Sequence, residues 1–581
     1  MSRRRPLVPA LAAAIALALA GAQGAPAAGT VDAGFGSGGA ASASLGIGAR
    51  GAGVALAPDG RIVVAGDRRG SGGEGALTAR FTAAGLPDPA FAGTGGRVDT
   101  FGTGDRPQRA GAVAAQADGS TVIAGVAGDR WMLARYLPTG MTDGLFGAAG
   151  VTLRDPLPGQ GPPERYPYEE PALPDGTGPA AIAIGAAGQI VVAGNVGVAN
   201  DDGIPGEQIV VARFGATGVP DPEFGRDGFA LLQLGFGSSI RHAASAARAL
   251  SLLPDGRILI AGRASARDGG DRAFVARLAA NGRLDSGFAR QGRLLVQLGR
   301  ASAVRVASSS LAALAQRPDG RLLAAGRATG VAGEQQLLLA GFTAAGALEG
   351  AFGRRGSFMT QLGRTSRSAV APASAARALA LQADGAAIAA GAATGGALAA
   401  RVGPGGKLDC GFGAGGRTLA FGGRRGFDPA VDGAFAAALQ PDGGLLLAGR
   451  LAGGGLLLGR LRGGPPANAP VAPAPRLVTL AARYSGRGRG YAYGLVDGDC
   501  RTQSVRFTVQ PPSGRTVVTA LQRVAGGFGP QVVCAPLKGL RPGARYRIRV
   551  SAATGGLRGA ARVLRTVKLS ARRTLAQEGC A

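Results

Sequence analysis

The sequence predicts an all-β protein, a seven-bladed β-propeller of four-stranded blades followed by a smaller β-sandwich. Two repeated motifs carry this prediction. In the first, an acidic residue is followed by Phe three positions later and Gly four positions after that, and the motif occurs seven times with unchanged spacing. In the second, an Asp-Gly pair precedes an apolar run and an Ala-Gly pair; a seventh copy, at residues 187–194, lacks the Asp. The first motif comprises Asp32/Phe35/Gly39, Asp88/Phe91/Gly95, Asp143/Phe146/Gly150, Asp221/Phe224/Gly228, Asp285/Phe288/Gly292, Glu349/Phe352/Gly356 and Asp409/Phe412/Gly416.

Each repeat contains four short strands, as the first full copy illustrates. We expect strands at residues 53–57, 61–65, 77–81 and 97–101, with an Asp-Gly turn between the first two in which Gly supplies a positive φ. A single sheet of this size cannot bury its faces alone, so neighbouring sheets must stack. Seven such sheets are typical of a propeller.

The order of the motifs predicts how the ring closes. The array begins with a corner and a fourth strand, at residues 40–46, and ends with strands one to three between residues 434 and 461. The two incomplete ends add up to one blade, and pairing them removes an exposed sheet edge. An open solenoid is the alternative, but it needs capping units, and neither end of the array shows one.

A third repeated position is an arginine that, where another repeat follows, precedes the next motif Phe by eleven residues. We expect it to pair with the motif acid within or between blades; a ring of acids that binds a ligand is the alternative. The unit that has Gly341 instead of this arginine also has Glu349 instead of Asp. The arginines are Arg80, Arg135, Arg213, Arg277, Arg401 and Arg460.

These motifs resemble the delta-60 repeat family. The resemblance covers about three quarters of the chain and departs from the family at Gly341, at Ala187-Gly188 and in a long insertion at residues 154–179. It implies an exported bacterial repeat protein and no defined activity. The segments that carry it are residues 284–292, 254–262 and 275–277.

The remaining segments predict export and a second domain. Residues 1–27 have the charged start, apolar stretch and small-residue cleavage sites of a signal peptide, so we expect a secreted or cell-surface protein outside the membrane. The propeller spans residues 30–462, a Pro/Ala-rich linker spans 463–475, a β-sandwich spans 476–569 and a tail spans 570–581.

The sandwich resembles fibronectin type III domains at residues 537–546, where a Leu-x-Pro-Gly-x-x-Tyr segment places Tyr546 at a corner. Because an exported protein keeps disulfides, we expect Cys500 and Cys534 to pair within this domain. A bond between Cys410 and Cys580 is the second expectation, and it requires the tail to fold back onto the propeller.

The charge admits two interpretations. The net charge is +28, almost entirely from arginine. A GC-rich genome favours such a composition, but a field this positive also attracts polyanions. With His242 as the sole histidine and no CxxC pair, a zinc site is not expected. The chain has no P-loop, and its two G-x-G-x-x-G segments are repeat corners. We expect a monomer that has no nucleic-acid partner and no stable membrane insertion. We expect no cofactor other than Ca²⁺.

Loop lengths predict where a ligand binds. The loops between strands one and two and between strands three and four have fixed lengths and share one face; the other loops vary in length and share the opposite face. We call the latter the variable-loop face and the former the corner face. Recognition is usual on variable loops of a rigid scaffold.

The leading functional hypothesis is therefore a non-enzymatic binding protein for an anionic glycan or cell-wall polymer. A carbohydrate-active enzyme that uses acidic loops of the third blade, and a structural spacer or adhesin, are the alternatives. Acidic loop residues of the third blade, Asp201, Asp202 and Glu207, are also candidate Ca²⁺ ligands. The candidate ligand-binding residues are Arg241, Arg300, Arg305, Arg364, Arg367, Tyr166 and Tyr168.

Overall fold

A computed structural model describes residues 28–463 and, between residues 476 and 568, the backbone of nine further strands. Within the first region, the following residues lie outside the described part: 42–47, 70–73, 102–107, 158–176, 200–204, 238–242, 302–305, 331–332, 361–372, 414, 423–427, 430–431 and 452–453. The predicted signal peptide, most of the linker and the tail also lie outside it.

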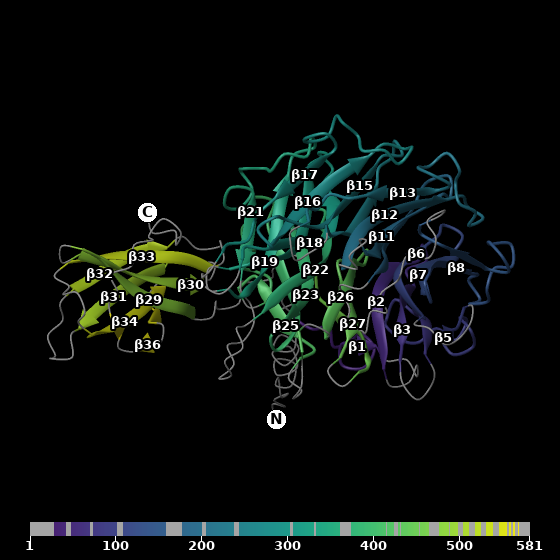
Figure 1. The fold of residues 1–581 in the computed structure, drawn as a ribbon. Coiled ribbons are helices and arrows are strands. Elements are labelled where there is room, and N and C mark those ends of the chain that lie inside the picture. Colours follow the sequence, from purple (N-terminus) through teal and green to yellow (C-terminus); the bar gives the residue numbers. More distant parts are fainter. Residues whose placement is uncertain are drawn as a thin grey trace, which may run out of the picture.

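Residues 28–463 form seven four-stranded antiparallel sheets arranged as a propeller, which confirms the predicted fold (Figure 1). The first blade consists of β2 (Ala49–Leu56), β3 (Ile62–Arg68), β4 (Gly75–Phe81) and β5 (Gly96–Asp99). Its first strand begins four residues earlier than the sequence predicted, because the ladder continues through a bulge between Gly51 and Gly53.

The next five blades repeat this strand order from the inside of the ring outward. Blade two has β6 (Gln108–Ala115), β7 (Thr121–Ala127), β8 (Arg130–Tyr136) and β9 (Val151–Arg154), and blade three has β10 (Gly178–Ile184), β11 (Ile190–Ala199), β12 (Pro205–Phe214) and β13 (Phe229–Leu232). Blade four has β14 (Ser245–Leu252), β15 (Ile258–Ser265), β16 (Asp271–Leu278) and β17 (Arg293–Val296), and blade five has β18 (Ser309–Gln316), β19 (Leu322–Thr329), β20 (Gln335–Phe342) and β21 (Ser357–Thr360). Blade six has β22 (Ser374–Leu381), β23 (Ala387–Ala393), β24 (Gly396–Val402) and β25 (Arg417–Ala420).

Blade seven contains strands from both ends of the array, as predicted. Its first three strands are β26 (Gly433–Leu439), β27 (Leu445–Arg450) and β28 (Leu456–Leu461), and its fourth is β1 (Ala40–Ala41). Ala40 pairs with Gly459 and Ala41 with Leu458. The contact also extends N-terminal to the predicted strand, since Gly29 N donates to Arg462 O at 2.5 Å.

The same backbone contact recurs at every junction between neighbouring blades. The residue after the motif Phe donates its N–H to a carbonyl in a turn of the following blade, and the next residue of that turn is a glycine with positive φ. Gly29 is the turn glycine of the closing junction, with φ of 80°. The seven donor–acceptor pairs are Gly36–Ala84, Ala92–Thr139, Gly147–Thr217, Gly225–Asn281, Ala289–Ala345, Gly353–Gly405 and Gly413–Ala28, at 2.7–2.9 Å.

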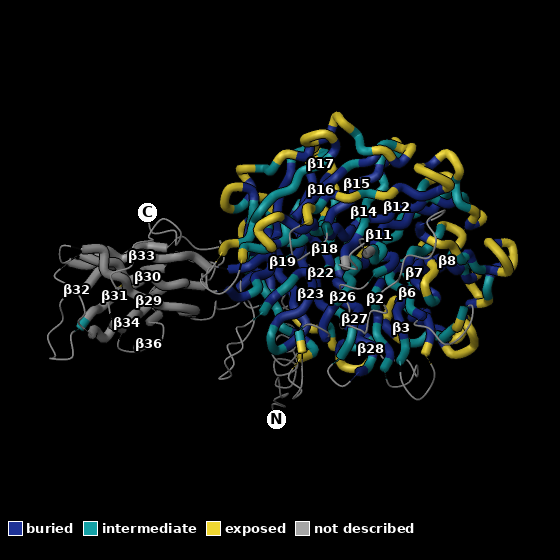
Figure 2. Tube along the Cα trace, in the orientation of Figure 1, coloured by how far each residue is buried: buried dark blue, intermediate teal, exposed yellow. Residues whose placement is uncertain are grey.

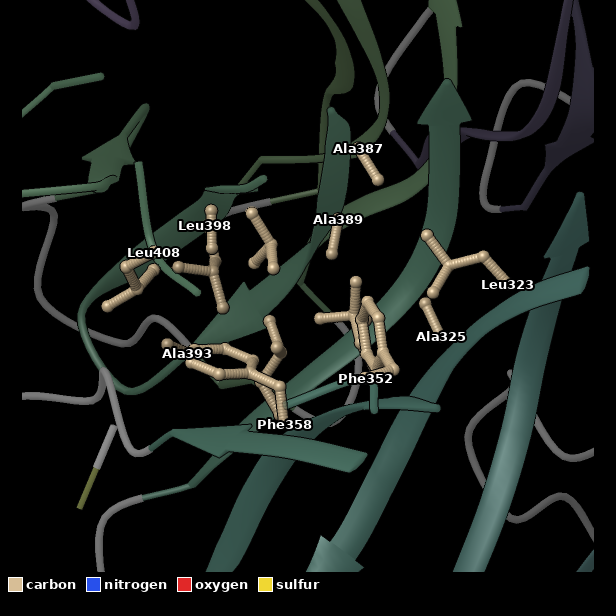
Figure 3. Close-up of a cluster of buried hydrophobic side chains, with 14 residues drawn as sticks. Leu323, Ala325, Phe352, Phe358, Ala387, Ala389, Ala393, Leu398 and Leu408 are labelled. Carbon is tan, nitrogen blue, oxygen red and sulfur yellow. The ribbon is translucent and has the colours of Figure 1, made fainter. Parts of the chain in front are cut away.

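Apolar side chains fill the space between neighbouring blades, and the strands of the ring are accordingly mostly buried while the exposed residues gather in the loops (Figure 2). In β19, Leu323 and Ala325 point into the core shared with blade six (Figure 3). Leu322 and Ala324 lie in the core shared with blade four. Successive residues of a strand face opposite sides of a sheet, so a strand buried on both sides needs a continuous apolar run. This requirement explains the apolar runs between the Asp-Gly and Ala-Gly pairs.

The predicted ion pairs form within the blades. Arg80 Nε lies 2.7 Å from an Asp88 carboxylate oxygen, and Arg277 Nε lies at the same distance from Asp285. Burial alone would raise the pKa of Asp285, but the hydrogen bonds from Arg277, Gly287 N and Arg257, together with the charge of Arg277, outweigh burial and lower that pKa. In blades one to four the guanidinium also lies over its motif phenyl ring, as Arg80 does over Phe91. Equivalent pairs are Arg135–Asp143, Arg213–Asp221, Arg401–Asp409 and, across the closing junction, Arg460–Asp32.

Blade five makes the same contact with a different arginine. A Cβ on Gly341 would lie 2.8 Å from Phe352 and 2.9 Å from the Glu349 carboxylate, so the usual arginine position is closed. Arg317, from the turn between β18 and β19, lies over the Phe352 ring and 3.7 Å from Glu349 instead. The longer Glu reaches this displaced guanidinium, which explains why the two sequence departures occur together.

The C-terminal strands form two antiparallel sheets. One has the order β29-β30-β33, and the other has β32-β31-β34-β35 with β36 and β37 also paired to β34. Their bounds are β29 (Arg476–Gly486), β30 (Arg489–Asp497), β31 (Gln503–Gln510), β32 (Val518–Val524), β33 (Pro530–Lys538), β34 (Arg545–Thr554), β35 (Leu557–Arg558), β36 (Arg562–Val563) and β37 (Val567–Lys568).

The cysteines are only partly described. Cys534 lies in β33, where its backbone pairs with Tyr493 of β30, and Cys500 lies outside the described residues. Cys410, in the corner of blade six, is disulfide-bonded. The pairing of Cys500 with Cys534 stays a prediction.

The closing junction gives a first test. A Cβ on Gly29 would lie 2.6 Å from Gly413 N, whereas one on Gly93 would meet nothing within 4 Å, and both glycines have positive φ. Both alanine variants carry a backbone cost of roughly 1 kcal/mol, but only Gly29→Ala adds a clash. We expect Gly29→Ala to lower the melting temperature more than Gly93→Ala and to speed hydrogen exchange in β28. Equal effects of the two variants would contradict closure through this contact.

The substitute arginine of blade five gives a second test. Arg317→Leu installs the residue that blade four has at the same position, Leu253, and leaves Glu349 with Arg321 alone. We expect a loss of about 2–3 kcal/mol in urea unfolding, since removing one partner of a buried ion pair is costly. Arg257→Leu, at a half-exposed arginine of blade four, is the control and should cost about 1 kcal/mol or less. Similar losses would show that Arg317 contributes no more than a surface arginine.

Peptide mapping under non-reducing conditions tests the disulfides. We expect one linked peptide pair with Cys500 and Cys534, and a second with Cys410 and Cys580. The first bond closes a loop of about thirty-five residues and should stabilise its domain by roughly 3–4 kcal/mol in the chain-entropy model. Free thiols at both Cys500 and Cys534 would contradict this pairing.

Candidate functional site

The innermost strand of every blade contains a bulge at the same position. In β14, for example, the pairing with β15 skips Arg248, which lies between Ala247 and Ala249. A bulge leaves one residue without a ladder partner and re-aims its side chain. All seven bulged residues line one cavity at the centre of the ring: Ala52, Gly111, Ala180, Arg248, Ala312, Arg377 and Phe435.

Further arginines reach this cavity from positions that lie nearer the variable-loop face than the bulges do. Arg50 and Arg109 lie on innermost strands, two positions before the bulge. In blades four and five the corresponding innermost residues are small, Ala246 and Ser310, and the arginine lies on the second strand instead. Arg263 and Arg327 pair with these two small residues in the ladder, so their long side chains pass beside them toward the axis.

The resulting cavity is strongly basic. Its volume is about 370 Å³. Six guanidinium groups line it, from five of the seven blades, and none of the described lining residues is acidic. The arginines occur where innermost strands begin and second strands end, which is the side of the variable loops. The six residues are Arg50, Arg109, Arg248, Arg263, Arg327 and Arg377.

Neighbouring groups orient several of these arginines. Arg109 donates to Thr177 O at 2.7 Å, and Arg377 donates to Pro429 O at 2.7 Å. A carbonyl oxygen orients a guanidinium without cancelling its charge. Arg50 lies 2.9 Å from the Asp67 carboxylate, and this ion pair offsets part of the local charge.

One aromatic side chain completes the ring of bulged residues. The guanidinium carbon of Arg377 lies 4.3 Å from the centroid of the Phe435 ring, and that of Arg50 lies 5.2 Å from it. Cation–π contacts of this kind hold the two guanidinium groups near the axis. The cavity thus offers fixed hydrogen-bond donors and positive charge, which suit carboxylate and phosphate oxygens.

Two of the predicted site residues are described. Arg300 is exposed, and its backbone N–H donates to Thr329 O at the end of β19. Glu207 is buried, and its carboxylate lies 2.5 Å from Arg263. The carboxylate therefore has an ion-pair partner, and the described residues contain no group of three or more His, Cys, Asp or Glu placed to hold a metal ion.

The other predicted site residues lie outside the described part, so their roles stay predictions. They are Arg241, Arg305, Arg364, Arg367, Tyr166, Tyr168, Asp201 and Asp202.

Sequence reasoning predicted ligand-binding arginines on the variable-loop face but missed that Arg109, Arg248 and Arg263 converge on the axis. A signal for the bulged arginines does exist. The hexapeptide Ser-Ala-Ala-Arg-Ala-Leu occurs at residues 245–250 and again at 374–379, and places Arg248 and Arg377 in equivalent bulges.

Comparisons with known proteins support the propeller and leave the activity open. Residues 57–91 and 253–288 match a family model described as a β-propeller domain of unknown function, DUF5122. No curated protein matches the chain. Among solved structures, sucrose-6-phosphate hydrolase from Lactobacillus gasseri is similar over 66% of this chain and 84% of its own, at 9% identity and a TM-score of 0.21, which is too low to carry an argument.

Among the described residues, no helix is both long and apolar enough to cross a membrane.

Proposed function

We propose that this protein is an exported, non-enzymatic binding protein that recognises an anionic glycan or cell-wall polymer through the variable-loop face of its propeller. One observation carries the proposal: guanidinium groups from five blades converge on a single cavity on that face. A repeat fold by itself has no need for such convergence, since the structural arginines pair with motif acids elsewhere in each blade.

The chemistry of arginine favours an oxyanion ligand. Its planar fork donates two parallel hydrogen bonds to a carboxylate or phosphate, and these bonds are strong when the donor is charged. A cleft lined by one sign of charge also raises the local concentration of the opposite ion. The exposed Arg300, beside the end of β19, extends this basic surface beyond the cavity.

The C-terminal domain and the route of export belong to the same proposal. We infer a fibronectin type III-like sandwich, which in exported proteins acts as a spacer or binding module. The two sheet orders support this inference. One sheet is β29-β30-β33, the other has β32-β31-β34-β35 as its main path, and β31 lies beside β34; this is an immunoglobulin-like arrangement. Residues 1–27 supply the export signal.

Salt-dependent binding to a polyanion tests the proposal. We expect the purified mature protein to bind polygalacturonate, and the affinity to fall steeply between low and physiological salt, because charge pairing is screened and counterions are released. Replacing four variable-loop arginines with Gln should weaken binding several-fold or more. The four are Arg300, Arg305, Arg364 and Arg367.

The control removes the same charge from the opposite face. Arg354 is unsuitable as a control, because partial desolvation and the nearby charge of Arg300 lower its pKa, so it is not independent of the Arg300 substitution. The control variant replaces four exposed arginines of the corner face with Gln, so it has the same net charge as the variable-loop variant. Equal weakening by both variants would mean a diffuse field without a site, and hydrolysis of the polymer would favour the carbohydrate-active enzyme. Absence of binding would favour a spacer. The control residues are Arg226, Arg283, Arg290 and Arg355.

A further inference from the structure

We propose that the cavity at the centre of the ring, called the central channel below, holds one oxyanion of the ligand. This oxyanion is a carboxylate or phosphate on a chain end or side group, which enters end-on and binds between Arg248 and Arg377. This inference rests on the proposed function for the identity of the polymer, and specifies which part of it is recognised. The alternative is a polymer that lies side-on across the variable-loop face.

The bulges select the residues that face the ligand. Each blade presents one bulged residue to the cavity, and this residue has no partner in the ladder. Blades one to three present small residues, whereas blades four and six present Arg248 and Arg377, and blade seven presents Phe435. Among the bulged residues, the positive charge is therefore confined to one side of the ring, which makes the site asymmetric.

The next level of the channel is apolar. Two positions beyond each bulge lies Val, Ile, Leu or Ala, and all seven of these residues line the same cavity. An oxyanion that moved past the arginines would lose its water without gaining a hydrogen-bond partner, at a cost of several kcal/mol. The apolar level therefore stops the charged group beside Arg248 and Arg377. The seven residues are Val54, Val113, Ile182, Leu250, Leu314, Leu379 and Ala437.

The size of the cavity agrees with a single inserted group. Its volume of about 370 Å³ lies at the lower end of small-molecule sites, which span roughly 300–1,000 Å³. Blades surround it laterally, so a polymer cannot lie across it, and the apolar level keeps a charged chain from passing along the axis. One chain end or side group per protein molecule is the stoichiometry that this geometry allows.

The fold itself supplies the variants for a test. Blades one, three and five carry Ala at the bulge, as Ala52, Ala180 and Ala312, so alanine is compatible with this backbone. Replacing Arg248 and Arg377 together with Ala changes the site without touching the inter-blade cores. Ala312→Arg places a third guanidinium between them and tests a gain of affinity.

Calorimetry on the mature full-length protein at low salt measures the binding. The probes are galacturonic acid, its trimer, polygalacturonate and, for the phosphate source, glycerol 3-phosphate. We expect a monomeric probe to bind at one per protein, and the trimer to bind within a few-fold of the monomer. R248A/R377A should weaken monomer binding at least tenfold, A312R should strengthen it, and the corner variant R226A/R290A should stay within twofold of the wild type. Whichever monomer binds identifies the oxyanion.

The outcomes separate this inference from the proposed function. If affinity rises with chain length and R248A/R377A leaves it unchanged, the polymer binds side-on; the proposed function then stands and the end-on site is overturned. If a monomer binds one-to-one, R248A/R377A abolishes that binding and no polymer binds, then the site stands and the proposed function fails. If neither monomers nor polymer bind, both are overturned.

Discussion

One recurring contact joins each blade to the next: a turn glycine packs against the motif Phe of the preceding blade, and the residue before that glycine accepts a backbone hydrogen bond from the residue after the Phe. Gly29 and Ala28 make the seventh of these contacts. Asp32 N also donates to Arg460 O, and Arg460 N donates to Gly39 O, as Asp88, Arg80 and Gly95 do within blade one. The N-terminal segment therefore reproduces a complete blade corner. Both cores that flank blade seven, and the closed shape of the central channel, depend on this segment being in place.

Rigid spacing explains why the fold was predictable from the sequence. Seven motifs with the same internal distances leave little freedom in where turns and strands fall, and two incomplete ends imply closure. Strand ends were less predictable. The first strand of each blade continues through a bulge, and nothing in a run such as Ala49–Leu56 distinguishes a bulged ladder from a turn before a shorter strand.

The site was less predictable because it is assembled across blades. Arg50 and Arg377 are 327 positions apart in the sequence, yet both contact the ring of Phe435. No spacing within one repeat can reveal such a contact. Blade five shows the same limit within a single blade: the replacement of the usual arginine by Arg317 follows from the space that Gly341 leaves, which becomes visible only once Phe352 and Glu349 are placed.

The bulge gives each blade one axis-facing residue that lies outside the ladder. In the second strand of each blade, the four residues that end at the Ala of the Ala-Gly pair are held between two inter-blade cores, and apart from Thr121 this constraint keeps them Ala, Val, Ile or Leu in blade after blade. A bulged residue contributes to neither the ladder nor, in most blades, the buried core, so Ala52, Gly111 and Ala180 can stand where other blades have Arg or Phe. Substitution there changes the charge of the channel at little cost to the fold. A symmetric scaffold can thus acquire an asymmetric site through single residues, and the two copies of Ser-Ala-Ala-Arg-Ala-Leu are the clearest example in this chain.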